Sequence, residues 1–549
     1  MSPARPTLGL VWGFLPLAAQ ATAFNPRSDR RKRNRHYTGF VFRALVSGVW
    51  VGVLVTSAAM ACVAQTAPAA PSPAAKSSQP PLATGVILPQ QVTAAKPDQS
   101  YALYLPSHYT PAKRWPIIYA FDPDARGSVP VELMKDAAER YGYIVLGSNN
   151  SRNGSWKVES EAAQAMWDDT HARLAIDDRR VYFAGFSGGA RVASALAQAC
   201  KCAAGVLLSG AGFSSSAPPA TVGFAVFAAV GSFDFNYPEL SDLDEKLEHA
   251  GSPHVLRHFD GPHQWAPAAV MDEALAWFRL IAMKQGPEAR DDSFVALQKS
   301  QAVARAHALE QAEPYEAWRE YREAIATFAG LADTAALEQA ASTLALQKAV
   351  RDGANREKQE FREQTQLAAG IYAGLAALRG GARSRPESSP ATEQPSAGAQ
   401  QHPSLPGLSG DDGSPSDLFS RTRQQIVELR QRAASEKKPD KMRVYRRALS
   451  GVFIGAVEAG EGSLDAKSYS LAAEYFQLAS DANPESGGVL QALARAEALA
   501  NDRKAALQAL HRAREKSKDL PAFSAWLNQE PAFAKLREDP QFRALVATP

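Results

Sequence analysis

The alternation of short apolar runs with helical patterns between Ile87 and Met283 most constrains the fold of this chain. Seven runs are rich in apolar, β-branched or aromatic residues, as strands buried on both faces are: "SYALYLP", "WPIIYAF", "YIVLGS", "VYFAGF", "AGVLLSG", "FAVFAAVGS" and "HVLRHF". Segments such as "VELMKDAAERYG" and "ARVASALAQACK" between them have helical spacing. The pattern predicts an α/β domain over residues 87–285 with a doubly wound, mainly parallel sheet.

The rest of the chain after this domain predicts helices only. Residues 290–379 contain long, charged, alanine-rich helical patterns. Residues 380–416 are rich in Pro, Ser and Gly and have too little apolar surface to form a core, so we expect a disordered linker there. A second helical domain is predicted over residues 417–549.

The second helical domain resembles the tetratricopeptide repeat. "LAAEYFQLASDANP" places four residues at the offsets of a helix pair of that repeat: Ala472, Phe476, Ala479 and Pro484. Continuing with a 34-residue period, small or apolar residues recur at corresponding places: Ala494, Ala506, Leu510 and Ala513. Glu497 stands where a tyrosine is expected. The resemblance implies stacked helices that bind a protein partner, and an irregular helical bundle is the alternative.

The N-terminal residues 1–64 resemble an export signal or a membrane anchor. A basic cluster at 27–36 precedes an almost uncharged stretch at 44–64, which is long enough to span a bilayer. Cys62 lies in "AMAC", which resembles a bacterial lipoprotein signal. Lipidation of Cys62 is therefore a third alternative, beside cleavage and anchoring. Residues 65–86 are rich in Pro and Ala and predict an extended tether. We therefore expect a periplasmic or extracellular protein, either freed by cleavage or anchored through residues 44–64.

Charge and cysteine content exclude some functions and favour others. A formal net charge of +3 over 549 residues gives no reason to expect a nucleic-acid partner. Cys200 and Cys202 are separated by one residue. We judge this spacing too tight for a disulfide, and a Cys-x-Cys pair alone does not make a metal site. Two buried thiols are therefore predicted, and no metal or cofactor is implied.

A serine between glycines, in "VYFAGFSGGARVAS", marks the point where a predicted strand turns into a helix. This is the context of a nucleophile elbow, which holds a serine on a strained turn with its hydroxyl exposed. Gly185 and Gly189 leave room where the strand and helix cross. Ser187 is the predicted nucleophile, and the backbone N–H of Gly188, at a helix N-terminus, is placed to face an oxyanion.

A serine nucleophile needs a histidine that takes its proton and a carboxylate that orients the histidine. Asp234 lies three residues beyond the glycine that ends a strongly apolar strand, and His263 lies in a Gly-Pro-His-Gln-Trp turn after the last strand. Their order in the chain, acid and then histidine, is the one such folds use. The competing residues belong to predicted helices or strand interiors: Asp242, Asp244, His171, His254 and His258.

With these residues, the segment Pro89–Met283 resembles the α/β-hydrolase superfamily, especially secreted esterases of the feruloyl esterase, dienelactone hydrolase and polyhydroxybutyrate depolymerase type. The resemblance implies Ser187 as nucleophile, His263 as general base and then acid, and Asp234 as the residue that orients the imidazole. One departure is "FDPD", where many relatives carry His-Gly. Because Pro123 has no N–H, the Asp124 amide is the predicted second oxyanion donor.

The combined prediction is an exported carboxylic ester hydrolase that works through an acyl-enzyme. Few residues separate Ser187 from Asp234, so no large cap domain is inserted there. That favours acyl groups on bulky substrates such as acylated polysaccharides or short polyesters. Two alternatives stay open: a catalytically idle scaffold whose helical repeats bind a protein partner, and a serine peptidase of the same fold. Trp265 is predicted either to line the substrate site or to cover the core.

Overall fold

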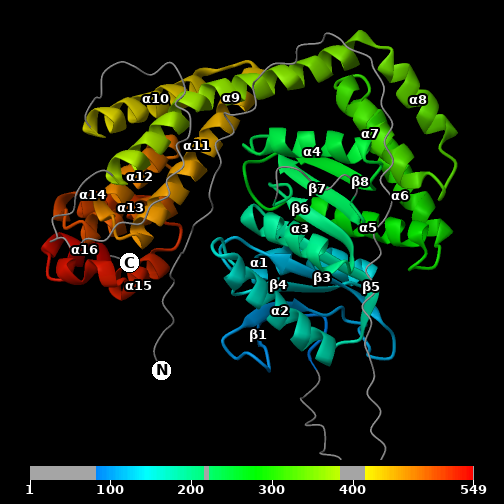
Figure 1. Cartoon of the computed structure of the whole chain (residues 1–549), viewed down its shortest axis with the longest axis horizontal. Coiled ribbons are helices and arrows are strands. Elements are labelled where there is room, and N and C mark those ends of the chain that lie inside the picture. The colour runs from blue at the N-terminus through cyan, green and yellow to red at the C-terminus, as the bar shows by residue number, and fades with distance from the viewer. Residues whose placement is uncertain (1–81, 215–221, 384–414, 548–549) are drawn as a thin grey trace, which may run out of the picture. The chain divides into compact units, whose positions relative to one another are not determined.

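A computed structural model describes residues 82–214, 222–383 and 415–547 (Figure 1). The predicted export signal or anchor at 1–64 lies outside these ranges, as do most of the tether at 65–86 and nearly all of the linker at 380–416. Within the three described ranges, no helix has both the length and the apolar character needed to cross a bilayer.

One eight-stranded sheet follows the order β1-β2-β4-β3-β5-β6-β7-β8. β2 pairs antiparallel with both β1 and β4, and every later pair is parallel. The strands are β1 (Ile87–Val92), β2 (Ser100–Tyr104), β3 (Trp115–Phe121), β4 (Ile144–Ser148), β5 (Ile176–Phe186), β6 (Ala203–Ser209), β7 (Ala225–Gly231) and β8 (His254–Phe259). All seven predicted strands are present, and the predicted doubly wound, mainly parallel sheet is confirmed.

Strand β1 is the element of the sheet that the sequence pattern missed. Its residues, "ILPQQV", include two glutamines and a proline, and they are only half buried or exposed. β1 is an edge strand that pairs with β2 alone. Proline and polar residues are tolerated at such an edge because one side of the strand has no partner.

Helices cover both faces of the sheet. α1 (Ser128–Tyr141) and α5 (Ala268–Gln285) share one apolar core with the strands. α2 (Trp156–Arg173), α3 (Gly188–Cys200) and α4 (Tyr237–His249) contribute nothing to that core and pack against the other face. This explains why β3 and β7 are buried along their whole length, as strands enclosed on two sides are.

The predicted all-α character of the C-terminal part is confirmed. Its first helices are α6 (Asp292–Leu309), α7 (Pro314–Phe328), α8 (Ala335–Ala345) and α9 (Lys348–Arg383). After residues 384–414 come α10 (Pro415–Ser435), α11 (Pro439–Asp465), α12 (Tyr469–Ala482), α13 (Gly487–Leu499), α14 (Arg503–Glu515), α15 (Leu520–Gln529), the short helix η2 (Pro531–Leu536) and α16 (Pro540–Ala547). α9 thus runs past the predicted boundary at residue 379.

Helices α12, α13 and α14 form one apolar core at positions that the repeat pattern singled out. Ala472 and Phe476 of α12, Ala494 of α13, and Ala506 and Leu510 of α14 are all fully buried in it. The small side chains allow the helices to approach closely, and the larger ones fill the space between them. The tetratricopeptide assignment itself stays a prediction.

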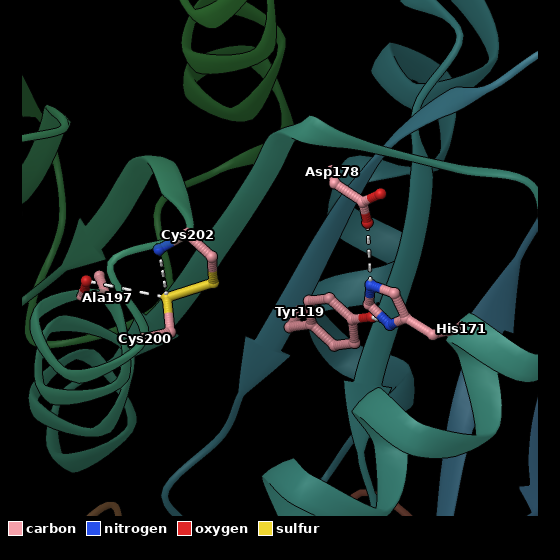
Figure 2. The surroundings of a disulfide bond; sticks show 6 residues. All are labelled: Tyr119, His171, Asp178, Ala197, Cys200 and Cys202. Carbon is pink, nitrogen blue, oxygen red and sulfur yellow. Dashed lines mark hydrogen bonds and ion pairs between the residues drawn. A yellow bond between two sulfur atoms is a disulfide. The ribbon is translucent and has the colours of Figure 1, made fainter.

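The expectation of two buried thiols is wrong, because Cys200 and Cys202 form a disulfide at the end of α3 (Figure 2). Lys201, between them, has a left-handed backbone with φ of 54°. That turn brings the two Cα atoms to 5.1 Å, a separation that a disulfide can bridge. Cys200 is exposed rather than buried.

Candidate active site

Ser187 lies on a strained turn between β5 and α3. Its φ and ψ are 53° and −120°, a combination that a residue with a side chain rarely adopts. Gly185 and Gly189 make the turn possible. A Cβ on Gly185 would lie 2.0 Å from the Gly189 carbonyl oxygen, and a Cβ on Gly189 would lie 2.0 Å from the Phe121 carbonyl oxygen. The strained turn between a strand and a helix that the sequence predicted is therefore present.

The structure brings Ser187, His263 and Asp234 into one chain of hydrogen-bond contacts. Nε2 of His263 lies 2.9 Å from Oγ of Ser187. Nδ1 of His263 lies 2.9 Å from both carboxylate oxygens of Asp234. The side chains of His263 and Asp234 are only 5% and 0% exposed. Both side chains therefore lie in a surrounding that is largely closed to water.

Neighbouring groups fix the histidine and the acid in place. The ring of His263 packs against the rings of Phe186 and Phe235, with ring centroids 4.7 and 4.6 Å away. Oδ1 of Asp234 also accepts the backbone N–H of Asn236 at 2.8 Å. Gly210 follows β6 with φ of +66°, and a Cβ there would press on Asp234, Phe186 and His263.

The competing aspartates and histidines lie elsewhere. Asp244 is within 3.3 Å of His254, and Asp242 pairs with Lys246 on the same helix. The ring of His258 stacks on Tyr237, and Nε2 of His171 faces Asp178 (Figure 2). None of these five is in contact with Ser187 in the described residues.

The amide predicted as second oxyanion donor is already engaged. The Asp124 N–H donates to Oδ1 of Asp122 at 2.9 Å, which is an Asx turn across Pro123. Asp122 is buried, and it also accepts hydrogen bonds from the side chains of Arg126 and Trp265. The carboxylate that replaces the expected His-Gly therefore organises this loop, and in this conformation the Asp124 amide is not available to a substrate.

Asn153 is a polar residue beside the elbow that sequence reasoning did not single out. A Cβ on Gly188 would lie 1.7 Å from Oδ1 and 3.1 Å from Nδ2 of Asn153, so the Asn153 carboxamide rests against the first residue of α3. The Asn153 N–H donates to the Pro123 carbonyl at 2.9 Å, which ties the two loops together. Its carboxamide has no hydrogen-bond partner among the described residues. The polar loop "GSNNSRNGSW" after β4 was the available signal.

Trp265 covers the core rather than lining a substrate site. Its side chain is 7% exposed, and its indole N–H donates to Oδ2 of Asp122 at 2.8 Å. It thus connects the turn that carries His263 with the loop that carries Asp122.

Comparisons with known proteins found likeness in solved structures only. No family model and no curated protein matches the chain. Among the solved structures, the fluorophosphonate-binding serine hydrolase FphF of Staphylococcus aureus is 13% identical, with a TM-score of 0.28, and the match covers 35% of this chain and 97% of that one. An esterase of Pyrobaculum calidifontis is 11% identical, with a TM-score of 0.31, over 36% of this chain and 87% of that one. The feruloyl esterase module of Clostridium thermocellum is 16% identical, with a TM-score of 0.29, over 35% and 87%.

The strand order and the strained turn at Ser187 define the fold of this part of the chain. An eight-stranded, mainly parallel sheet with a serine on a strained turn after a central strand is the arrangement of the α/β-hydrolases. The part of the chain from β1 to α5 has the α/β-hydrolase fold.

Proposed function

We propose that this protein is a serine hydrolase that cleaves carboxylic esters through an acyl-enzyme. One observation carries the proposal: Ser187, His263 and Asp234 form an unbroken chain of 2.9 Å contacts at a strained elbow. A strained turn costs folding free energy, and so does the burial of an aspartate. Such costly arrangements are typical of functional sites.

The reaction follows from the direction of these contacts. Oγ of Ser187 attacks the ester carbonyl carbon while its proton passes to Nε2 of His263. The tetrahedral intermediate collapses, and the departing alcohol takes that proton. Water then attacks the acyl-enzyme, gives a proton to His263, and the acid leaves as the proton returns to Oγ. Asp234 stabilises the imidazolium at both stages.

We propose that the oxyanion is held by the Gly188 N–H and the Asn153 side chain. Gly188 begins α3, so its N–H is one of the unpaired donors at a helix N-terminus. The Asn153 carboxamide lies against Gly188, and a half-turn about its last side-chain bond exchanges Oδ1 and Nδ2. A side-chain amide would then supply the second hydrogen bond, in place of the Asp124 amide that Asp122 occupies.

The substrate class that we propose is an acyl ester on a bulky carrier, such as an acylated polysaccharide or a short polyester. Between Ser187 and Asp234 the described residues contain only α3, β6 and β7 as regular elements, so no cap domain separates the two there. We further propose that the protein is exported. The basic and apolar N-terminal segments support this, as does the disulfide, since disulfides persist in oxidising compartments.

Labelling with a fluorophosphonate probe tests the proposal. We expect labelling of the wild type, and loss of labelling and of p-nitrophenyl ester hydrolysis by at least about 1,000-fold in Ser187→Ala and His263→Ala. The matched controls are Ser214→Ala and His249→Ala, which change an exposed serine and an exposed histidine.

Two results would contradict the proposal. A folded wild type that takes up no probe would favour the idle scaffold, and a pull-down through the C-terminal helices would then test for a protein partner. Labelling together with cleavage of anilides but not of esters would favour a peptidase.

A further inference from the structure

Helices α9 and α11 of the C-terminal part contact the loop that carries Asp234. We call residues Ser232–Tyr237 the acid loop. This loop leads from β7 into α4. Its Asp234 side chain is fully buried and contacts His263. α9 and α11 follow it by more than a hundred residues (Figure 1).

Two side chains from these helices bind the backbone of the acid loop. Nε of Arg447, on α11, donates to the Ser232 carbonyl at 2.8 Å. Nε2 of Gln364, on α9, donates to the Phe235 carbonyl at 2.9 Å. The two carbonyls flank Asp234 on either side. Because a shielded backbone carbonyl needs a partner, these bonds restrict the backbone on both sides of the acid.

Arg447 is itself held firmly. It is 2% exposed, its Nη1 donates to Oε2 of Glu360 on α9 at 3.1 Å, and its guanidinium lies 3.7 Å from the ring centroid of Tyr237 at the end of the acid loop. A buried guanidinium with a carboxylate partner and an aromatic face has little freedom to move.

Helix α11 also contacts the side chain of Phe235, whose ring lies against His263. Gly451 of α11 lies against this side chain: a Cβ there would lie 3.1 Å from the Phe235 Cβ. The Phe235 ring in turn contacts the His263 ring at a centroid distance of 4.6 Å. A Cβ at position 451 would also lie 2.3 Å from the Tyr372 hydroxyl, so α11 is closely packed at this position.

We infer that Arg447 and Gln364 are positioning residues for the reaction, and that the C-terminal helices thereby form a fixed part of the active site rather than a separate binding appendage. The inference rests on the proposed function. Through the acid loop, the two side chains hold Asp234 against Nδ1 of His263, and Asp234 in turn holds the proton that makes His263 a base.

The test compares Gln364→Leu and Arg447→Gln with the wild type in the full-length protein. Gln364→Leu removes one hydrogen bond of a neutral side chain, so we expect it to disturb folding less than Arg447→Gln does. Arg447→Gln leaves Glu360 paired with Arg443 at 3.0 Å. The matched control is Arg423→Gln, which removes an ion pair with Asp481 inside the C-terminal helices.

We expect kcat for a p-nitrophenyl ester to fall about 10-fold or more in both variants, while KM changes less than about threefold, because a small displacement of a catalytic group is costly. The acidic limb of the pH profile of kcat/KM should also move to lower pH by about 0.5 unit or more, since an imidazolium that faces a displaced carboxylate loses its proton more easily. Arg423→Gln should match the wild type in kcat and in the position of the acidic limb.

Two outcomes would overturn the inference while the proposed function stands: unchanged kcat in both variants, or a lower kcat with an unmoved acidic limb. A wild type without Ser187-dependent hydrolysis would instead contradict the proposed function, and the inference with it.

Discussion

At the scale of single residues, Asn153 and Glu159 are two polar side chains outside the contacts of Ser187, His263 and Asp234, and we expect the first to affect catalysis and the second to affect the pH dependence of stability. Both follow strand β4 in a loop and a first helical turn that carry no recognisable motif. Their importance comes from where the fold places them.

Replacing Asn153 by alanine should weaken catalysis without weakening folding. If its carboxamide binds the oxyanion, Asn153→Ala will lower kcat by about 100-fold, the usual effect of removing one such donor, and leave KM nearly unchanged. Steady-state kinetics with a p-nitrophenyl ester measures this. Asn150→Ala, in the same loop, is the control. Wild-type kcat in Asn153→Ala would rule out the assignment.

Replacing Glu159 by glutamine should stabilise the protein at neutral pH. Glu159 is 1% exposed, Oε2 has no hydrogen-bond partner within the described residues, and burial raises the pKa of the carboxyl from 4.5 to about 8. The unfolded chain therefore loses this proton near pH 4.5, and the folded protein keeps it until about pH 8. The contribution of Glu159 to stability falls as pH rises through that window.

Glutamine at position 159 has no proton to lose, so Glu159→Gln should gain on the order of 1–3 kcal/mol relative to the wild type at pH 7 and little at pH 4.5. Urea unfolding at several pH values measures the difference. Glu161→Gln, two residues further on the exposed face of α2, should show no such pH dependence. An equal gain at both pH values would contradict the assignment of the raised pKa.

At the scale of elements, α3 packs closely against both β5 and β3 beside the site. Gly189→Ala places a Cβ 2.0 Å from the Phe121 carbonyl oxygen, so the helix must move away from the sheet. We expect a loss of about 1–3 kcal/mol in the free energy of unfolding and a loss of activity, because Ser187 is displaced with the helix. Thermal unfolding and ester hydrolysis report the two effects.

Gly488 provides the matched control for this substitution. It lies in α13, where a Cβ would meet nothing within 4 Å. Gly488→Ala should therefore be neutral or stabilising by about 0.5–1 kcal/mol. A Gly189→Ala protein as stable and active as Gly488→Ala would show that the crossing tolerates a side chain.

At the scale of the whole molecule, the contacts of α9 and α11 with the acid loop predict that damage to the apolar core of α12, α13 and α14 reaches the candidate active site. Phe476 is fully buried in that core and packs against Gly460 of α11. Phe476→Ala should cost about 3–5 kcal/mol of stability in the C-terminal helices. The temperature of half-inactivation of ester hydrolysis should fall together with the helical unfolding seen by circular dichroism.

Leu297→Ala, which changes a leucine that is 55% exposed on α6, controls for the loss of an apolar side chain. If Phe476→Ala unfolds the helices at a lower temperature and hydrolysis survives to the wild-type temperature, the two parts are energetically independent.

The strands, the elbow and the order of Ser187, Asp234 and His263 were predictable from the sequence because each rests on local chemistry. Apolar runs become buried strands, glycines permit a strained turn, and loops that follow strands carry the acid and the histidine. The edge strand β1 was missed because it buries little and so has a weak pattern.

The remaining features were decided only by the tertiary structure. The Asp124 amide is engaged in an Asx turn, the left-handed conformation of Lys201 allows a disulfide, and Asn153 reaches Gly188 from another loop. The contacts of Arg447 and Gln364 with the acid loop join residues separated by 215 and 129 positions in the chain. No local pattern encodes such a pair, because its energy exists only once distant segments are packed and water has been excluded between them.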